Sequence, residues 1–145
     1  MAATRSPASA VLAAEAWRAL LDYFFENRDR HVALAAEFGL TVGDMKTLLS
    51  LRSDEPCSMR SLAAEWKCDA SNVTWLVDRL EERGLVERRT SPLDRRVKTV
   101  VLTTAGVTMK EAVLERMYEP PEAMLALPRE DLQALARALG KLRAD

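Results

Sequence analysis

Histidine and cysteine are scarce in this chain of 145 residues, which has one histidine, His31, and two cysteines, Cys57 and Cys68. The cysteines are eleven positions apart, so the sequence has neither the CxxC spacing nor the set of His and Cys ligands typical of a structural zinc site. A redox pair of the two cysteines stays open as the alternative to two inert thiols. We therefore expect no metal site and no cofactor.

Long apolar runs and recognisable catalytic motifs are also lacking. No stretch approaches the roughly 20 apolar residues that span a bilayer, and the first ten residues lack the apolar run of a secretion signal. The sequence contains no glycine-rich phosphate loop and no Ser/His/Asp or Cys/His set in a recognisable context. These absences argue against a membrane protein and an enzyme, and they predict a cytoplasmic chain.

The composition is that of a folded protein, but its positive charge is unevenly distributed. Hydrophobic residues make up 48% and charged residues 30%, and the net charge of −1 gives no general attraction to nucleic acid. The length suits a single domain, or a helical frame that carries one small module. From Arg83 to Lys98, however, six basic residues stand against two acidic ones. Such clustering is typical of a nucleic-acid-binding surface.

Apolar periodicity and capping residues predict a mainly α-helical fold with one small β-hairpin. Residues 1–7 are small and polar, and we expect them to be disordered. Helices are predicted from about residue 8 to 37, after Thr41 as far as Leu51, over 59–66, after Asp69 up to Gly84, from Thr103 or Thr104 to Pro120, and from near Pro128 through Leu142.

The middle of the chain has the layout of a helix-turn-helix followed by a hairpin. The short helix 59–66, which Ser58 can cap, is separated by the turn "KCD" from the longer helix that begins after Asp69. The segments "LVERR" and "RVKTVVL" are rich in Val, Leu and Thr and flank turn residues, so they predict two antiparallel strands.

The longer helix has one apolar side and one polar side. The outward side of its first half carries Ser71, Asn72, Thr74 and Trp75, with Arg79 flanking it. In a helix-turn-helix this part of the second helix enters the major groove, where hydroxyls and amides bind base edges and apolar groups meet the thymine methyl. Asn72 is the candidate for adenine. For Trp75 two partners stay open, either the neighbouring short helix or hairpin, or the groove itself.

Basic residues gather along the predicted hairpin, at Arg88, Arg89, Arg95, Arg96 and Lys98. On an exposed hairpin such charges can serve only to discourage aggregation between strand edges. Beside a helix-turn-helix they can instead neutralise phosphates, and an arginine at the tip can enter the minor groove. Asp94 would be repelled by DNA, so we expect it to hold a neighbouring arginine in one orientation. Ser58 and Arg60, at the start of the short helix, complete the predicted DNA contacts.

The segment Ser61–Gly106 resembles the winged helix-turn-helix of the MarR family of bacterial transcriptional regulators. The most specific parts are "LVDRLEERGLVERR" and the pattern Asp94-x-Arg96 followed by Leu102 and Thr103. The resemblance implies a winged helix-turn-helix DNA-binding domain over 41–103 and a helical dimerisation region over 8–38 and 104–145. Apolar stripes on the terminal helices exceed what one small winged domain could bury, which also favours a dimer.

The resemblance further implies a homodimeric repressor that reads a pseudo-palindromic operator on double-stranded DNA, with Arg96 in the minor groove. It implies release by a small effector, often aromatic or phenolic, for which Trp17, Phe24 and His31 are candidate contacts; an ordinary core stripe is the alternative for these residues. The sequence departs from the family at Trp75, where relatives often carry a small or basic residue, so the usual base contacts cannot be carried over to this position. The alternative function is a winged-helix module that binds a protein partner.

Overall fold

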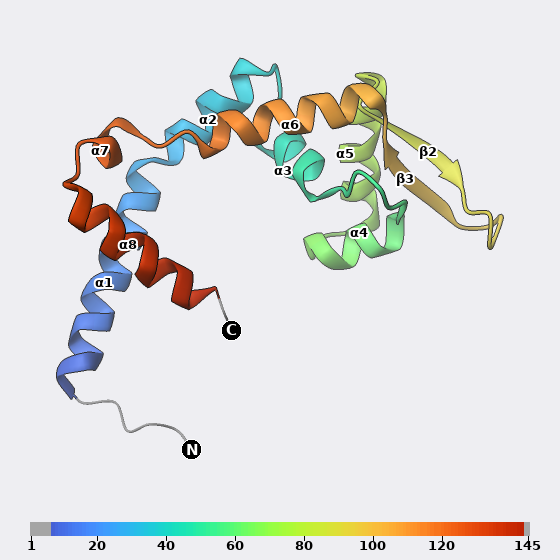
Figure 1. The fold of residues 1–145 in the computed structure, drawn as a ribbon. Coiled ribbons are helices and arrows are strands. Elements are labelled where there is room, and N and C mark those ends of the chain that lie inside the picture. The colour runs from blue at the N-terminus through green and yellow to red at the C-terminus, as the bar shows by residue number, and fades with distance from the viewer. Residues whose placement is uncertain (1–6, 144–145) are drawn as a thin grey trace.

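The computed structural model describes residues 7–143 and confirms a mainly α-helical fold with a small β-sheet wing (Figure 1). Its elements are α1 (Pro7–Glu26), α2 (Arg28–Glu37), α3 (Val42–Ser50), β1 (Cys57–Ser58), α4 (Met59–Trp66), α5 (Ala70–Glu82), β2 (Val86–Thr90), β3 (Lys98–Leu102), α6 (Thr104–Tyr118), α7 (Glu122–Leu125) and α8 (Arg129–Leu142). Of the predicted disordered segment, residues 1–6 lie outside the described residues, whereas Pro7 begins α1.

The single long helix predicted from residue 8 to 37 is wrong, because the chain breaks at Asn27 into α1 and α2. The Nδ2 atom of Asn27 donates a hydrogen bond to the carbonyl oxygen of Tyr23 at 2.8 Å, beside the backbone N–H of Asn27 at 3.1 Å. A side chain that shares a main-chain acceptor competes with the regular helical bonds and favours a break. The two helices run in different directions in Figure 1.

The predicted helix starts after Thr41 and Ser58 are confirmed by side-chain caps. Thr41 and Asp44 form a capping box at the start of α3, with hydrogen bonds of 3.1 and 3.0 Å. The hydroxyl of Ser58 accepts the backbone N–H of Ser61 at 3.0 Å and starts α4. Asp69 occupies the N-cap position of α5, but its side chain makes no capping hydrogen bond. The predicted start of α5 after Asp69 is thus confirmed, but without the side-chain hydrogen bond of a cap.

The sheet has three antiparallel strands in the order β1-β3-β2. Strands β2 and β3 form the predicted hairpin, with Val86 opposite Leu102 and Thr90 opposite Lys98. Strand β1 was not predicted, because two residues are too few to show an alternating pattern. Its Cys57 pairs with Val100 and ties the chain before α4 to the wing.

The buried core lies where α3, α4 and α5 meet the sheet, α2 and α6. Its fully buried side chains include Leu48, Leu62, Val73, Val77, Leu80, Val100 and Val113. The predicted start of α6 at Thr103 or Thr104 is confirmed: α6 begins at Thr104, and the hydroxyl of Thr103 caps it by accepting the backbone N–H of Gly106 at 3.0 Å. A Cβ atom at Gly106 would overlap the carbonyl oxygen of Leu85, so a glycine is needed for α6 to start this close to β2.

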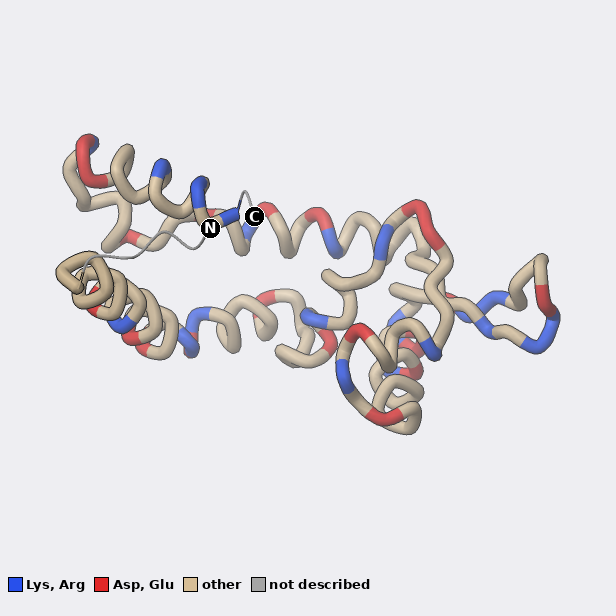
Figure 2. Tube along the Cα trace, turned by 90° about the horizontal axis from the view of Figure 1, so that it is seen from below, with Lys and Arg blue, Asp and Glu red and all other residues tan. Residues whose placement is uncertain are grey.

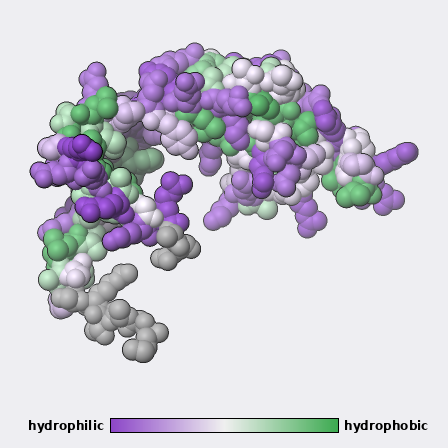
Figure 3. All heavy atoms as spheres, in the orientation of Figure 1, coloured by the Kyte–Doolittle hydropathy of each residue, from purple (hydrophilic) through white to green (hydrophobic). Residues whose placement is uncertain are grey.

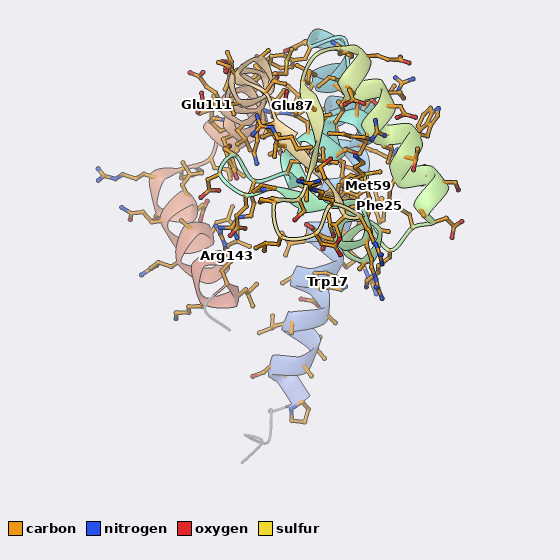
Figure 4. The ribbon with its side chains drawn as sticks, turned by 90° about the vertical axis from the view of Figure 1, so that its right-hand side faces the viewer. Trp17, Phe25, Met59, Glu87, Glu111 and Arg143 are labelled. Atoms are coloured by element: carbon orange, nitrogen blue, oxygen red, sulfur yellow. The ribbon has the colours of Figure 1, made fainter. Side chains whose placement is uncertain are left out.

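The terminal helices stand away from this core. Helices α1 and α8 bury no residue within the described chain, and Trp17 on α1 is 62% exposed. They cross in the projection of Figure 1, but Figures 2 and 4 show them apart. The interpretation of the first helix as an ordinary core stripe is therefore wrong for the single chain. Within residues 7–143, every helix is too short or too polar to cross a membrane.

Candidate nucleic-acid interface

Helix α5 separates its apolar and polar sides as predicted. The predicted contact residues Ser71, Asn72, Thr74 and Trp75 are all exposed along its first half. The other side is anchored by Val73 and Val77, which are fully buried. The hydroxyl of Thr74 donates to the carbonyl oxygen of Ala70 at 2.9 Å, so its proton is engaged within the helix and only its lone pairs face outward. At the edge of the molecule in Figure 4, α5 turns one side away from the other helices.

Trp75 remains 54% exposed, and its neighbour is a side chain that the sequence did not suggest. The guanidinium carbon of Arg79 lies 4.9 Å from the centroid of the indole ring, in the geometry of a cation–π contact. Arg79 comes from the next turn of the same helix, where residues four apart are neighbours. More than half of Trp75 is therefore not covered by the short helix, the hairpin or any other part of the described chain.

Arg79 is held from behind by Asp44, a residue that sequence reasoning missed. The Nε and Nη2 atoms of Arg79 donate to the two carboxylate oxygens of Asp44 at 2.9 and 2.8 Å. Asp44 is fully buried, and these hydrogen bonds hold the pKa of its carboxyl well below its usual range. The available signal was the capping-box position of Asp44, three residues after Thr41.

The wing carries the predicted basic residues toward its tip. Arg95, Arg96 and Lys98 are exposed, and Figure 2 shows Lys and Arg along the wing and at its end, with an acidic residue between them. Asp94, which precedes the two arginines in the sequence, accepts a hydrogen bond from the backbone N–H of Arg96 at 2.9 Å. Asp94 thus fixes the backbone of the tip, instead of the arginine side chain that we expected it to hold.

Arg88 and Arg89 differ although they are neighbours in β2. Arg88 pairs with Asp78 and Glu81 of α5, and its backbone N–H donates to Glu81 at 2.9 Å, so it joins the wing to the recognition helix. Its side chain is 24% exposed, whereas that of Arg89, paired with Glu87, is 62% exposed. Their position suits Arg89 better than Arg88 for a phosphate contact.

Among the remaining predicted contacts, the start of α4 presents one charged and one polar side chain. Arg60 is exposed, and the hydroxyl of Ser58 is engaged with Ser61 as the helix cap. Lys98 donates to the hydroxyl of Thr90 across the hairpin at 2.9 Å. The predicted residues thus belong to three neighbouring elements, namely the start of α4, the outward side of α5 and the wing.

The sequence matches known proteins of one family. Residues 40–98 match the family model described as MarR family. The uncharacterized HTH-type transcriptional regulator YwoH of Bacillus subtilis (strain 168) is 33% identical over 94 residues, which make up 65% of this chain and 68% of that protein. The chain belongs to the MarR family. Proteins of the MarR family bind DNA, so this chain is a DNA-binding transcriptional regulator.

Solved structures agree with the MarR assignment. A cysteine-to-serine mutant of MarR from E. coli superposes with a TM-score of 0.73 at 25% identity, over 85% of this chain and 93% of that one. A mutant of MepR from S. aureus bound to an oligodeoxyribonucleotide gives a TM-score of 0.68 at 21% identity, over 87% and 94% of the two chains. The second likeness shows the fold alone.

An open cleft of about 320 Å³ lies between α1, α2 and the connection from α6 to α7 of this MarR family chain. Phe24 and His31, two of the three predicted effector contacts, line it with their ring centroids 6.0 Å apart. Leu34, which is part of the buried core, forms another portion of the wall. Trp17 is not among the residues that line the cleft, so the structure does not bring the three candidates together.

The two cysteines are half-buried and unbridged. Burial raises the pKa of the Cys57 thiol, and the nearby Glu65 and Glu55 raise it further. A raised pKa keeps the thiol protonated at neutral pH and lowers its nucleophilicity. The inert interpretation of Cys57 therefore fits its surroundings better than a redox role does.

Proposed function

We propose that this chain acts as a homodimeric repressor that binds a pseudo-palindromic operator and leaves it when a small aromatic ligand binds. The observation that carries the proposal is the pairing of an exposed polar half of α5 with an exposed basic wing on the same module. The first can enter a major groove, and the second can reach the adjacent phosphates and minor groove.

The dimer is supported by apolar surface that a single chain leaves uncovered. Large apolar side chains on α1 are exposed, among them Val11, Leu12, Trp17, Phe24 and Phe25, and Leu142 on α8 is exposed as well. Figure 3 shows hydrophobic colour in several places on this part of the molecule. Exposed apolar surface of this extent marks an interaction site, and a second copy would cover it symmetrically.

The effector is supported by the composition of the cleft. Phe24 and Leu34 offer apolar surface, while His31, Asn27 and Arg30 bring polar groups to the same wall. A concave, mostly apolar site with a few polar groups is the usual form of a small-molecule site. Its place on α2, next to the module that carries α5, would let a ligand influence the position of the recognition helix.

The proposal is tested by selecting bound sequences from a random pool of duplex DNA and then measuring affinity for the recovered operator. Arg96→Ala is expected to weaken binding about ten-fold or more, because it removes the wing-tip charge, while Arg28→Ala, which removes the same charge from α2, should change little. Phenol and benzoate are expected to release the wild-type protein from the operator.

The recovered sequences also test the geometry. Two half-sites about one helical turn apart are expected from a two-fold symmetric dimer. Equal affinity of Arg96→Ala and wild type would remove the wing from the mechanism. Failure of the wild type to bind any duplex at low salt would instead favour the protein-interaction alternative.

A further inference from the structure

The recognition helix presents an aromatic ring whose position is fixed from the interior of the protein. Trp75 and Arg79 lie one turn apart on α5, and the guanidinium carbon of Arg79 is 4.9 Å from the centre of the indole ring. This contact involves one face of the indole. More than half of the Trp75 side chain nevertheless remains open to solvent.

Arg79 cannot turn easily toward solvent, because Asp44 binds it at two points. The two hydrogen bonds, from Nε at 2.9 Å and Nη2 at 2.8 Å, form a bidentate pair with a carboxylate that has no exposed surface. The second oxygen of Asp44 also accepts the backbone N–H of Thr41 at 3.0 Å, which anchors it to the start of α3. The chain of contacts runs from the start of α3, through Asp44 and Arg79, to Trp75.

This arrangement changes the role expected for Arg79. Its charge is balanced by a buried carboxylate 2.8 Å away, so the pair attracts phosphate less than an unpaired arginine would. The group that the pair exposes on the outward side of α5 is the apolar indole. In the major groove, the apolar feature that differs between base pairs is the C5-methyl group of thymine.

We infer that Trp75 is a specificity-determining residue that recognises thymine methyl groups, and that Asp44 is a positioning residue that holds the indole in place through Arg79. The inference rests on the proposed function, because it requires α5 to enter the major groove. It assigns base recognition to the exposed indole of α5, and it gives the buried ion pair a role in DNA recognition.

The test uses the selected operator with each thymine replaced in turn by deoxyuridine, which removes only the methyl group. Wild type is expected to lose about four-fold in affinity at one or more positions per half-site, the equivalent of one buried methyl group. Trp75→Ala should bind more weakly overall and become insensitive to that replacement. Asn72→Ala, a change one turn away on the same surface, should keep the sensitivity.

The positioning role is tested with Arg79→Gln and Asp44→Asn. In both variants we expect a smaller loss of affinity on replacing thymine by deoxyuridine, while the protein stays folded and assembled. In combination with Trp75→Ala, neither variant should reduce this loss further. If Arg79 and Asp44 had a purely structural role, their variants would lose the same factor in affinity for the thymine operator and for the operator with deoxyuridine. If Asp44→Asn does not fold, Arg79→Gln and Trp75→Ala still decide the outcome, because the amide of glutamine can still donate a hydrogen bond to Asp44 and Trp75 is exposed.

The results separate this inference from the proposed function. Wild type that binds the operator but is indifferent to every deoxyuridine replacement overturns the role of Trp75 and leaves the repressor proposal intact. Sensitivity that persists in Trp75→Ala overturns it as well, since another side chain must then contact the methyl group. Wild type that binds no duplex contradicts the proposed function itself.

Discussion

At the scale of the residue, Asp44 carries a negative charge at a position with no exposed surface. An ionised carboxylate is tolerated there because its oxygens accept hydrogen bonds from Arg79 and from the backbone of Thr41. The carboxylate thereby joins the start of α3 to the last turn of α5. Loss of its charge should be felt in the stability of the whole module.

The pH dependence of stability tests this role. The folded-state pKa of Asp44 is depressed, first by its hydrogen bonds with Arg79, so its contribution is present above the pKa of the unfolded chain, about 4, and is lost at lower pH. We expect the difference in free energy of unfolding between wild type and Asp44→Asn to be largest near pH 7 and to shrink below about pH 5. Urea unfolding at a series of pH values measures it.

A matched control is available at the surface. Asp54, whose side chain is 82% exposed and lies 4.0 Å from Arg52, should show almost no pH-dependent difference when changed to Asn. A gap between wild type and Asp44→Asn that stayed constant from neutral to acid pH would mean that the charge of Asp44 does not stabilise the fold.

At the scale of the element, the wing is attached to the recognition helix by one arginine. Arg88 of β2 pairs with Asp78 and Glu81, which are one turn apart on α5. The strand therefore cannot rotate about its own axis without breaking two ion pairs. The direction in which the wing tip points is set at its base.

Comparison of two neighbouring arginines tests this attachment. Arg88→Met is expected to lower the free energy of unfolding by about 1 to 2 kcal/mol, because Asp78 and Glu81 lose the guanidinium that pairs with both, although Glu81 keeps the backbone N–H of residue 88. Arg89→Met removes a more exposed pair and should change it by less than about 0.5 kcal/mol. Thermal or urea unfolding compares the two, and equal effects would show that the pairing of Arg88 does not hold the wing.

Local chemistry explains which elements could be predicted from the sequence. The caps at Thr41, Ser58 and Thr103 act within three residues, so the helix starts were predictable. Asn27 also acts locally, but asparagine is tolerated inside helices. The apolar periodicity continues across Asn27, so the sequence does not show that the helix breaks there. Strand β1 and helix α7 are too short to show a period.

Contacts between distant residues explain what was missed in the site. Asp44 and Arg79 are 35 positions apart, and only the packing of α3 on α5 brings them together. The sequence therefore gave the correct side of α5 but could not show that Arg79 is neutralised. The pairs of Arg88 with Asp78 and Glu81 were missed for the same reason.

At the scale of the whole molecule, the buried core lies in and beside the winged module, and the terminal helices α1 and α8 contribute no buried residue to it. The core of the module is completed by Leu34 and Ala35 of α2 and Val113 of α6, whereas α1 and α8 expose their apolar residues. Figure 4 shows Trp17 on the part of α1 that extends beyond the module. A second chain packed on these helices would bury surface that this chain cannot bury alone.

Replacement of Trp17 by Glu tests this arrangement. One large apolar side chain from each copy contributes about 2 kcal/mol when buried, so the dissociation constant of the dimer should rise about a thousand-fold. Leu93→Glu, at the wing tip where the leucine is 96% exposed, makes the same kind of change and should leave the dimer intact. Sedimentation equilibrium measures both, and a dimeric Trp17→Glu protein would place the interface elsewhere.

Leu34 is shared by the wall of the cleft and the interior of the module, and it is only 6% exposed. A ligand that displaced the Leu34 side chain would leave a cavity in the core, and cavities in close-packed interiors lower the free energy of unfolding. A flat molecule that rests on Phe24 avoids that penalty, whereas a branched one does not. For the proposed effector, we therefore expect the cleft to discriminate between ligands by their thickness before their polarity.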